Sequence, residues 1–302
     1  MDSSPLHNHS IRALLKRGID ELRHAQVSSS TLDAELLLLH ATGRDRTWIY
    51  SHPEEELPDE TVDQFLTLIG RRRDGEPTQH LTGRQEFWGL RFEVSPDVLI
   101  PRPETEHLVE VALDRLAGRE LRTGRDRPFT GKNIRLVDIG TGSGCIAVAL
   151  AKELPDAEVY ATDSSAAALE IAKRNCACHG LAHRIHFLES NLLDRLPSLK
   201  FDLIISNPPY LALAEADSLP VEVRRYEPAE ALFGGPYGYE LYGPLILQSA
   251  KQLHPGGLLV VELGQDSLSA VEPLLDASTW EGVGVTKDLA GINRVLSALR
   301  RG

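Results

Sequence analysis

Residues 134–153 read IRLVDIGTGSGCIAVALAKE, and this stretch decides the fold. An apolar strand candidate at 134–139 runs into three glycines at alternate positions, and an apolar helix candidate follows at 145–153. Glycine permits a tight turn and lets a ligand approach the backbone. Alone, the glycines could serve only that strand-to-helix turn, so their meaning depends on the sequence around them.

Strand and helix candidates alternate from about residue 105 onward. Further strand candidates lie at 158–162, 184–188, 201–206, 258–262, 282–286 and 294–299, and a second helix candidate lies at 166–179. Such alternation predicts an α/β fold with a doubly wound, mainly parallel sheet. We expect residues 119–132, rich in Arg, Gly, Asp and Thr, to form an exposed loop.

The chain has a different character before residue 85. Apolar residues recur every three or four positions at 10–22, 30–40 and 59–73, which predicts a small all-α domain over residues 1–84. We expect a buried stripe on the second helix, formed by Leu32, Leu36, Leu37 and Leu39. This domain either holds a macromolecular substrate or serves as a scaffold. Residues 86–94 predict a β-hairpin with Gly89 at or near its turn, within a linker of residues 85–104 that leads to a domain of residues 105–302.

The glycine turn and Asp163 together predict a cofactor. Asp163 ends the second strand candidate, near the distance of about 20 residues at which a carboxylate holds ribose hydroxyls. The glycine spacing is Gly-x-Gly-x-Gly rather than the Gly-x-Gly-x-x-Gly that seats a dinucleotide pyrophosphate. An adenosine cofactor that carries an amino acid fits this spacing better, which indicates S-adenosylmethionine.

Asn207-Pro208-Pro209-Tyr210 follow the strand candidate at 201–206, where function collects in open α/β sheets. The Asn207 side-chain oxygen can accept an N–H bond. The prolines stiffen the turn and leave their carbonyls available as acceptors. Tyr210 offers a flat face with a polar tip. A plain proline turn is the alternative, but the combination suits the grip on a planar NH2 group.

Composition and charge restrict the partners. The chain has 302 residues, 42% of them hydrophobic, and no apolar run approaches the roughly 18 residues that span a bilayer. Its three cysteines and 11 histidines show no disulfide or ligand spacing, so we expect no metal. The net charge of −12 argues against nucleic acid, whose phosphates call for a basic face. We expect residues 71–73, the only basic run, to be the solvated end of a helix. The sequence shows no secretory signal, and its few cysteines fit a reducing cytoplasm, so we expect a cytoplasmic protein. We also expect a monomer.

Six motifs resemble those of the release factor glutamine methyltransferase family, also called the HemK or PrmC family. They are EPTQHLTG at 76–83, FWG at 87–89, LIPRPETE at 99–106, NPPY at 207–210, EPAEALFGG at 227–235 and DLAGINRV at 288–295. The resemblance covers nearly the whole chain. It implies a class I, Rossmann-like methyltransferase domain after an all-α domain and a β-hairpin linker. Members transfer a methyl group from S-adenosylmethionine to the glutamine side-chain amide in the Gly-Gly-Gln loop of class 1 peptide-chain release factors, leaving S-adenosylhomocysteine.

The resemblance also assigns roles to residues. The positions that would line the methionine part of the cofactor are Gly140, Thr141, Gly142, Ser143 and Gly144, and Asp163 would hold the ribose. Asn191 and Leu192 stand near the adenine, where an acid and an aromatic residue are usual. Three further positions depart from the usual residues of the family: Tyr237, Tyr239 and Gly243. We expect this segment to face the protein substrate.

The chemistry of an amide nitrogen suggests how the substrate would be held. Its lone pair is delocalised, so positioning rather than a general base is the main requirement. We expect the Asn207 side-chain oxygen and the Pro208 carbonyl to accept hydrogen bonds from the two N–H groups of the glutamine side chain. The amide nitrogen would then lie next to the cofactor. Pro209 would stiffen the turn and leave its carbonyl as a further acceptor, and Tyr210 would pack against the amide. Pre-positioning of this kind can supply about 7–11 kcal/mol.

Several alternatives stay open. A nucleic-acid methyltransferase that acts on an exocyclic amine faces the same aiming problem, although flipped bases favour basic and aromatic neighbours. A noncatalytic binding protein with the same fold is a second alternative. Arg102 and Glu104 either border the cofactor site or form an internal salt bridge. Glu227 and Glu262 either stabilise loops and strand ends or act as bases.

Overall fold

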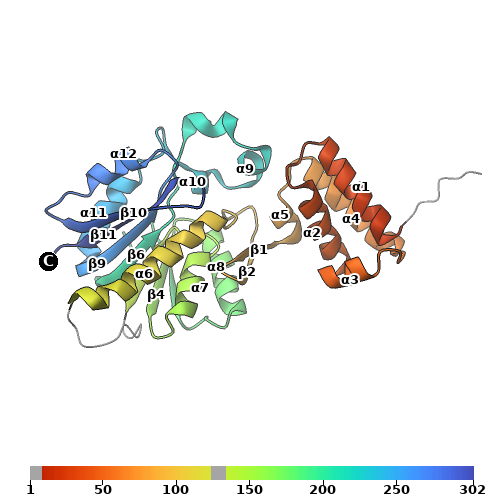
Figure 1. Cartoon of the computed structure of the whole chain (residues 1–302). Helices are drawn as coiled ribbons and strands as arrows, with labels where there is room; N and C mark the ends of the chain where they lie inside the picture. The colour runs from red at the N-terminus through yellow and green to blue at the C-terminus, as the bar shows by residue number, and fades with distance from the viewer. Residues whose placement is uncertain (1–8, 124–133) are drawn as a thin grey trace, which may run out of the picture. The chain divides into compact units, whose positions relative to one another are not determined.

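A computed structural model describes residues 9–123 and 134–302, which fold as two compact units (Figure 1). The first unit comprises the chain up to Arg84 together with Pro220–Tyr226. The second comprises Gln85–Leu219 and Glu227–Gly302. The chain therefore leaves the second unit soon after the Asn-Pro-Pro-Tyr motif and re-enters it at residue 227. No sequence motif had indicated this excursion.

The first unit is helical. Its helices are α1 (Ile11–His24), α2 (Ser30–Thr42), α3 (Arg46–Ser51), α4 (Asp59–Arg73), α5 (Thr78–Thr82) and α9 (Val221–Tyr226). The predicted helices at 10–22, 30–40 and 59–73 are thereby confirmed. Ser10 begins α1 by accepting a hydrogen bond from the Ala13 N–H at 3.4 Å. A Cβ atom at Gly18 would lie 2.7 Å from the Phe65 ring, so this glycine lets α1 and α4 pack closely.

The predicted leucine stripe on α2 is wrong for two of its members. Leu32 and Leu36 are 49% and 36% exposed, whereas Leu37 and Leu38 are fully buried. This helix is apolar on several faces, so spacing alone could not identify the buried one. An acidic residue turns inward instead: Asp33 is buried because it forms an ion pair with a buried arginine of α4.

The expectation that residues 71–73 form a solvated helix end is wrong for Arg72. This side chain is only 6% exposed, and its guanidinium lies 2.8 Å from Asp33 and 2.6 Å from Glu222 of α9. Arg71 conforms to the expectation, with an exposed ion pair to Glu76 at 2.6 Å. Two carboxylates distant in sequence thus offset the desolvation of one buried arginine.

The second unit is built on a seven-stranded sheet with strand order β10-β11-β9-β6-β3-β4-β5. The strands are β3 (Arg135–Ile139), β4 (Glu158–Asp163), β5 (Ile185–Glu189), β6 (Phe201–Ser206), β9 (Leu253–Glu262), β10 (Trp280–Lys287) and β11 (Asn293–Arg300). The five neighbouring strands from β9 to β5 run parallel, and β11 is antiparallel to both of its neighbours, β9 and β10. The predicted mainly parallel sheet and its seven strands are confirmed.

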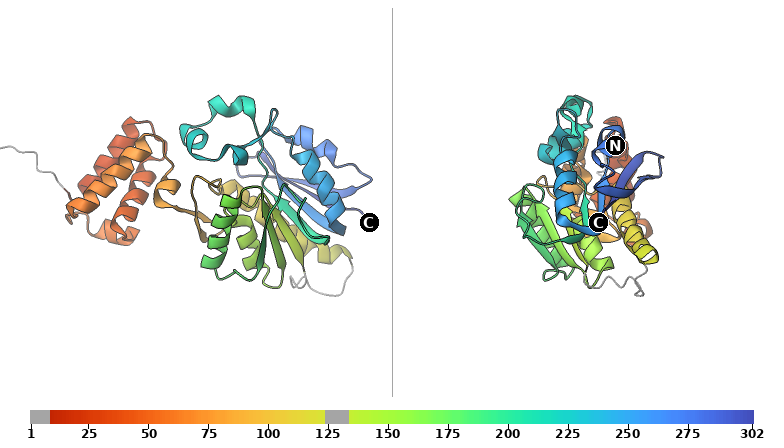
Figure 2. Two further views of the ribbon diagram at one scale, coloured as in Figure 1. Left: turned by 180° about the vertical axis from the view of Figure 1, so that it is seen from behind. Right: turned by 90° about the vertical axis from the view of Figure 1, so that its left-hand side faces the viewer.

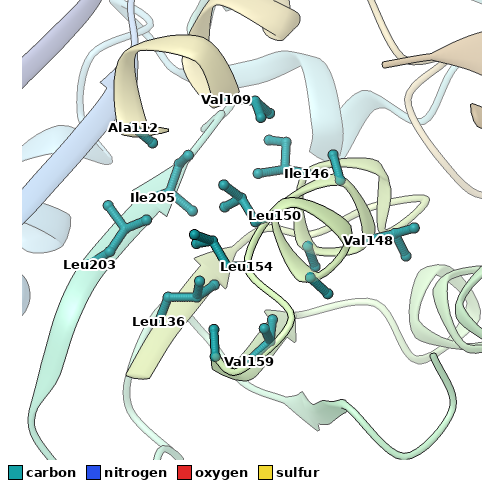
Figure 3. Packing of buried hydrophobic residues seen from close by; sticks show 14 of the residues in the cluster. Val109, Ala112, Leu136, Ile146, Val148, Leu150, Leu154, Val159, Leu203 and Ile205 are labelled. Atoms are coloured by element: carbon teal, nitrogen blue, oxygen red, sulfur yellow. The ribbon is translucent and has the colours of Figure 1, made fainter. Parts of the chain in front are cut away.

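Helices cover both faces of this sheet (Figure 2). Leu136, Leu203 and Ile205 point to the face that packs α6 (Glu106–Thr123), α7 (Cys145–Glu153) and α8 (Ala166–Cys178). Figure 3 shows α7 seated on this face, with Ile146 and Leu150 among the strand side chains. The alternate residues Val137 and Ile204 point to the opposite face, which packs α11 (Tyr242–Gln252) and α12 (Leu268–Val271). The period of two along each strand therefore builds two apolar layers.

Short elements complete the second unit. They are β1 (Arg84–Phe87), β2 (Leu90–Glu93), η1 (Pro103–Thr105), β7 (Leu211–Ala212), η2 (Leu213–Ser218), α10 (Ala229–Leu232), β8 (Phe233–Gly235) and η3 (Glu272–Leu274). The predicted hairpin is confirmed: Trp88 and Gly89 join β1 to β2 with φ of 55° and 66°. The expectation of a loop at 119–132 is wrong for 119–123, which continue α6, and the rest of it lies outside the described residues.

Candidate functional site

The glycine turn and the Asn-Pro-Pro-Tyr motif meet at one edge of the sheet. β3 and β6 are parallel neighbours, and Ile139 pairs in register with Ser206, so the residues that follow both strands emerge side by side. The chain order reverses here, since β4 and β5 lie on one side of β3 and β6 lies on the other. Ligands of open α/β sheets bind at such a reversal.

The glycine turn presents bare backbone at this edge. Gly140, Gly142 and Gly144 adopt φ values of 70°, 55° and 82°, a region that favours glycine. A Cβ atom at Gly140 or Gly142 would meet no atom within 4 Å, so nothing in the described chain covers the turn there. A small ligand could therefore approach the backbone at these two positions.

Asp163, at the end of β4, is hydrogen-bonded to the backbone of this turn. Its Oδ2 accepts a hydrogen bond from the Gly142 N–H at 2.8 Å, and its Oδ1 accepts one from the Ser165 N–H at 2.9 Å. Burial raises the pKa of this carboxyl, against the backbone donors that favour its charge. Each carboxylate oxygen has two lone pairs, so both oxygens keep capacity for further donors such as ribose hydroxyls.

Asp138 is a buried acid in the stretch that decides the fold, but the sequence did not indicate its burial or its raised pKa. The Thr141 hydroxyl donates to its Oδ2 at 2.6 Å, while Oδ1 has no hydrogen-bond partner among the described residues. Burial raises the pKa of Asp138 to about 7. A buried oxygen without a partner is uncommon, and this one lies within β3, two residues before the glycine turn, which suits a site for a cationic or donor group.

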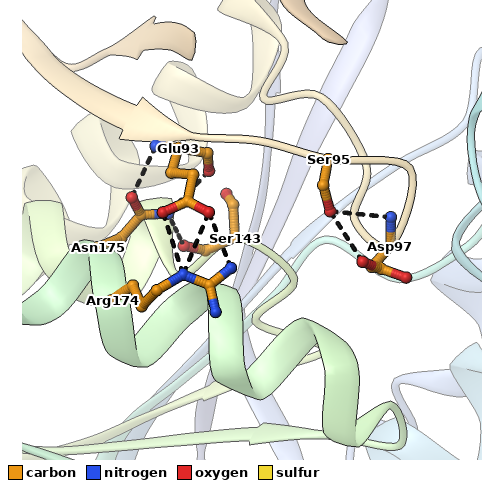
Figure 4. A network of polar contacts seen from close by, with 6 residues as sticks. All are labelled: Glu93, Ser95, Asp97, Ser143, Arg174 and Asn175. Carbon is orange, nitrogen blue, oxygen red and sulfur yellow. Dashed lines mark hydrogen bonds and ion pairs between the residues drawn. The ribbon is translucent and has the colours of Figure 1, made fainter. Parts of the chain in front are cut away.

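Asn175 of α8, which sequence reasoning missed, ties the glycine turn to the hairpin (Figure 4). Its side-chain amide donates to the carbonyls of Ser143 and Glu93, both at 2.9 Å, and accepts from the Glu93 N–H at 2.7 Å. The side chain is 1% exposed. An amide between two helices carries no sequence signal, because its partners are backbone atoms.

Asn207 lies directly beyond β6 and is half-buried. Its Nδ2 donates a hydrogen bond to the Thr105 hydroxyl at 3.1 Å. Neither Asn207 Oδ1 nor the Pro208 carbonyl accepts a hydrogen bond from the residues that the structure describes. The two predicted acceptors therefore keep their capacity for a substrate.

Tyr210 is fixed by a buried acid. Its hydroxyl donates to Glu262 Oε1 at 3.3 Å, and a Cβ atom at Gly264 would lie 3.0 Å from its ring. Burial raises the pKa of Tyr210, so the phenol stays protonated. Burial likewise raises the pKa of Glu262 to about 7, although Thr105, Arg294 and Tyr210 oppose the shift.

Glycines of the 234–239 segment pack on the same motif. A Cβ atom at Gly234 would lie 2.5 Å from the Pro209 carbonyl oxygen, and one at Gly238 would lie 2.5 Å from that of Tyr210. The departures Tyr237 and Tyr239 stack on each other with centroids 5.8 Å apart and are 71% and 39% exposed. This segment thus forms one side of the motif and presents two aromatic rings outward.

The remaining predicted site residues lie outside the strands of the sheet. Asn191 and Leu192 follow β5 at the edge next to β4, and the Thr162 hydroxyl donates to the Leu192 carbonyl at 3.1 Å. Leu192 adopts a φ of 48°, which is uncommon for a non-glycine residue. Arg102 forms an ion pair with buried Glu227, which supports the salt-bridge alternative for Arg102 and a loop-stabilising position for Glu227.

Groups of metal ligands and membrane-spanning helices are both absent from the described part of the chain. Within residues 9–123 and 134–302, no three His, Cys, Asp or Glu side chains are grouped as metal ligands. None of the helices described is long and apolar enough to cross a membrane.

Comparison with known proteins places these features among methyltransferases. Residues 13–83 match the family model of the PrmC N-terminal domain, and residues 127–222 match that of the methyltransferase small domain. Release factor glutamine methyltransferase of Koribacter versatilis is 42% identical over 93% of this chain and 97% of its own. The protein of the same name from Moorella thermoacetica is 41% identical over 97% of this chain and 99% of its own.

Solved structures share the fold at lower identity. The hMettl16 catalytic domain, in complex with an RNA hairpin, aligns with a TM-score of 0.54 at 20% identity, over 80% of this chain and 82% of its own. A methyltransferase from Pyrococcus furiosus aligns with a TM-score of 0.51 at 20% identity, over 71% of this chain and 90% of its own. These likenesses confirm the Rossmann-like methyltransferase fold.

Proposed function

The chain belongs to the release factor glutamine methyltransferase family, and from this we propose that it methylates the glutamine side-chain amide in the Gly-Gly-Gln loop of a class 1 peptide-chain release factor. One observation carries the proposal beyond the family name. At the strand reversal, an uncovered glycine turn lies beside Asn207 Oδ1 and the Pro208 carbonyl, two acceptors unused by the described chain.

The residues at the glycine turn fit S-adenosylmethionine. Gly140, Thr141, Gly142, Ser143 and Gly144 would hold its methionine part, Asp163 its ribose, and Asn191 with Leu192 its adenine. The Oδ1 of Asp138 is buried without a hydrogen-bond partner among the described residues, which suits a cofactor with an ammonium group. When bound, the sulfonium supplies an activated methyl group.

The protein's own task is then to aim the amide nitrogen. Asn207 Oδ1 and the Pro208 carbonyl accept hydrogen bonds from the two N–H groups of the glutamine side chain. These bonds turn the lone pair of the amide nitrogen toward the methyl group. Pro209 keeps the turn rigid, and Tyr210, held by Glu262, bounds the amide plane. No base is required before transfer, since the proton leaves the nitrogen only after it has gained the methyl group.

We assign the docking of the release factor to the helical unit, residues 1–84, with the hairpin of residues 85–104 as linker to the catalytic residues 105–302. The acidic net charge of −12 supports a protein rather than a nucleic-acid substrate. A substrate used in translation implies a cytoplasmic enzyme, and we propose that it acts as a monomer.

Transfer of a labelled methyl group tests the proposal. The protein is incubated with labelled S-adenosylmethionine and one of three acceptors: a release factor, the same factor with its Gly-Gly-Gln glutamine changed to alanine, or total nucleic acid. Label in the first acceptor alone supports the proposal. Label in nucleic acid supports the exocyclic-amine alternative, and label in none supports a noncatalytic protein; either result overturns the proposal.

A further inference from the structure

Asn207 can aim a substrate amide only if its own carboxamide faces the correct way. The oxygen and the nitrogen of a carboxamide have nearly the same shape, and rotation about χ2 exchanges them within a broad, roughly two-fold torsion. With Oδ1 outward, Asn207 accepts from the substrate NH2 group. With Nδ2 outward, two donors face each other and the bond is lost.

Thr105 is placed to decide between these orientations. It ends η1, outside the Asn-Pro-Pro-Tyr motif, and is 2% exposed. Its Oγ1 accepts the hydrogen bond from Asn207 Nδ2 at 3.1 Å. A hydroxyl, however, has one hydrogen as well as lone pairs, so it could also donate to an Asn207 turned the other way.

Glu262 offers an acceptor for that hydrogen. It is the last residue of β9, the strand beside β6, and is 1% exposed. Val261 pairs in register with Ser206, so Glu262 stands one residue beyond the last pair, as Asn207 does. Glu262 Oε1 accepts from the Tyr210 hydroxyl at 3.3 Å, its buried Oε2 has no hydrogen-bond partner among the described residues, and Thr105 is among the groups that favour its charged form. An ionised carboxylate only accepts, so a hydroxyl that donates to it can only accept from Asn207.

We propose that Thr105 is a positioning residue for methyl transfer: with its hydrogen directed to Glu262, it holds Asn207 with Nδ2 inward and Oδ1 toward the substrate. This inference rests on the proposed function for its catalytic consequence. The orientation of Asn207 is a property of the protein alone.

Kinetics with three variants test the catalytic consequence. Thr105→Val keeps the shape and removes the hydroxyl, and it lowers kcat by about 10-fold to 100-fold, as expected when a buried polar partner is lost. The KM for the release factor and the affinity for S-adenosylmethionine change by less than about threefold, since the Asn207 contact is a small part of either interface. Thr105→Ser restores the hydroxyl and kcat. Glu262→Gln also lowers kcat, and the Thr105→Val/Glu262→Gln double variant is no slower than the slower single variant, because both act through one hydrogen bond.

Nuclear magnetic resonance of the Asn207 side-chain amide tests the orientation without any substrate. The 15N-labelled NH2 signal, assigned by its loss in Asn207→Asp, shows slow hydrogen exchange in the wild type and in Thr105→Ser, and fast exchange in Thr105→Val. If this holds while the wild type methylates no release factor, the proposed function fails and the orientation stands. An unchanged NH2 signal and kcat in Thr105→Val overturn the inference, as does a Thr105→Ser variant that is as slow as Thr105→Val.

Discussion

Replacement of Asn175 by leucine should destabilise the second unit and weaken cofactor binding together. The substitution keeps the volume of a side chain that is 1% exposed and removes three hydrogen bonds of 2.7–2.9 Å. The Glu93 N–H, the Glu93 carbonyl and the Ser143 carbonyl then lose their partner. A buried group left unpaired costs about 1–3 kcal/mol. Because the three groups share one side chain and can relax together, we expect a total loss of about 2–4 kcal/mol.

Arg174→Ala is the matched control. Arg174 is the neighbour of Asn175 on α8 and also contacts Glu93, through an ion pair of 2.8 Å. Both partners are exposed, at 50% and 43%, and exposed ion pairs contribute about 0–1 kcal/mol. Two variants on one helix that contact the same residue thus differ several-fold in predicted cost, because only one of them is buried.

Urea denaturation followed by tryptophan fluorescence measures both losses. Trp88 and Trp280 lie in the second unit and Trp48 in the first, so a Trp48→Phe background restricts the signal to the second unit. Calorimetric titration with S-adenosylmethionine should show weaker binding for Asn175→Leu alone, because the Ser143 carbonyl is released. An Asn175→Leu variant no less stable than Arg174→Ala, or one with unchanged cofactor affinity, would refute the reasoning.

Three further predictions follow from other contacts. Asp163→Asn has only one side-chain oxygen and cannot accept hydrogen bonds from the N–H groups of both Gly142 and Ser165. We expect the affinity of this variant for S-adenosylmethionine to fall about 10-fold to 100-fold in titration calorimetry. An unchanged affinity would contradict the assignment of Asp163 to the ribose. Arg72→Met leaves Asp33 and Glu222 without their partner and should lower the stability of the helical unit by about 3–5 kcal/mol. The control variant Arg71→Met should lower it by less than about 1 kcal/mol. Thermal denaturation measures both losses, and equal losses would show that burial of the arginine is not decisive. An ionised Glu262 can only accept from Thr105, whereas a protonated Glu262 can also donate to it. Because burial raises the pKa of Glu262 to about 7, kcat should rise with pH through about 7, and Glu262→Gln should lose this dependence. Arg294, Tyr210 and Glu104 also act on Glu262, and an identical pH profile in the variant would assign the dependence to another group.

The sheet was predictable because its signals are local. Apolar strand segments, the glycine turn and the proline turn each declare themselves within a few residues, and β6 and α7 occupy the residues expected. Parallel strands bring their carboxyl ends to one edge, so the meeting of residues 140–144 with Asn207 also followed from the pattern. In the site, the motif residues were therefore predictable.

The groups that support the motifs were less accessible to sequence reasoning. Thr105 and Asn175 act on partners 102 and 32 residues away, the Asn207 side chain and the Ser143 carbonyl. Thr105 lies in the motif at 99–106, but nothing in the sequence pairs it with Asn207. The inward turn of Arg72 depends on two carboxylates that the fold brings together, one of them from the returning segment at 220–226. Contacts of this kind arise from tertiary structure and have no period or spacing along the chain.

Mass spectrometry of the Gly-Gly-Gln peptide tests the central claim most directly. A release factor is incubated with S-adenosylmethionine and either the wild-type protein or Asn207→Ala, and the peptide is fragmented to locate any added methyl group. We predict one methyl group on the glutamine side-chain nitrogen with the wild type, and a rate lower by about 10²–10³-fold with Asn207→Ala at unchanged cofactor affinity. A methyl group at any other atom, or an Asn207→Ala variant as fast as the wild type, would contradict the account.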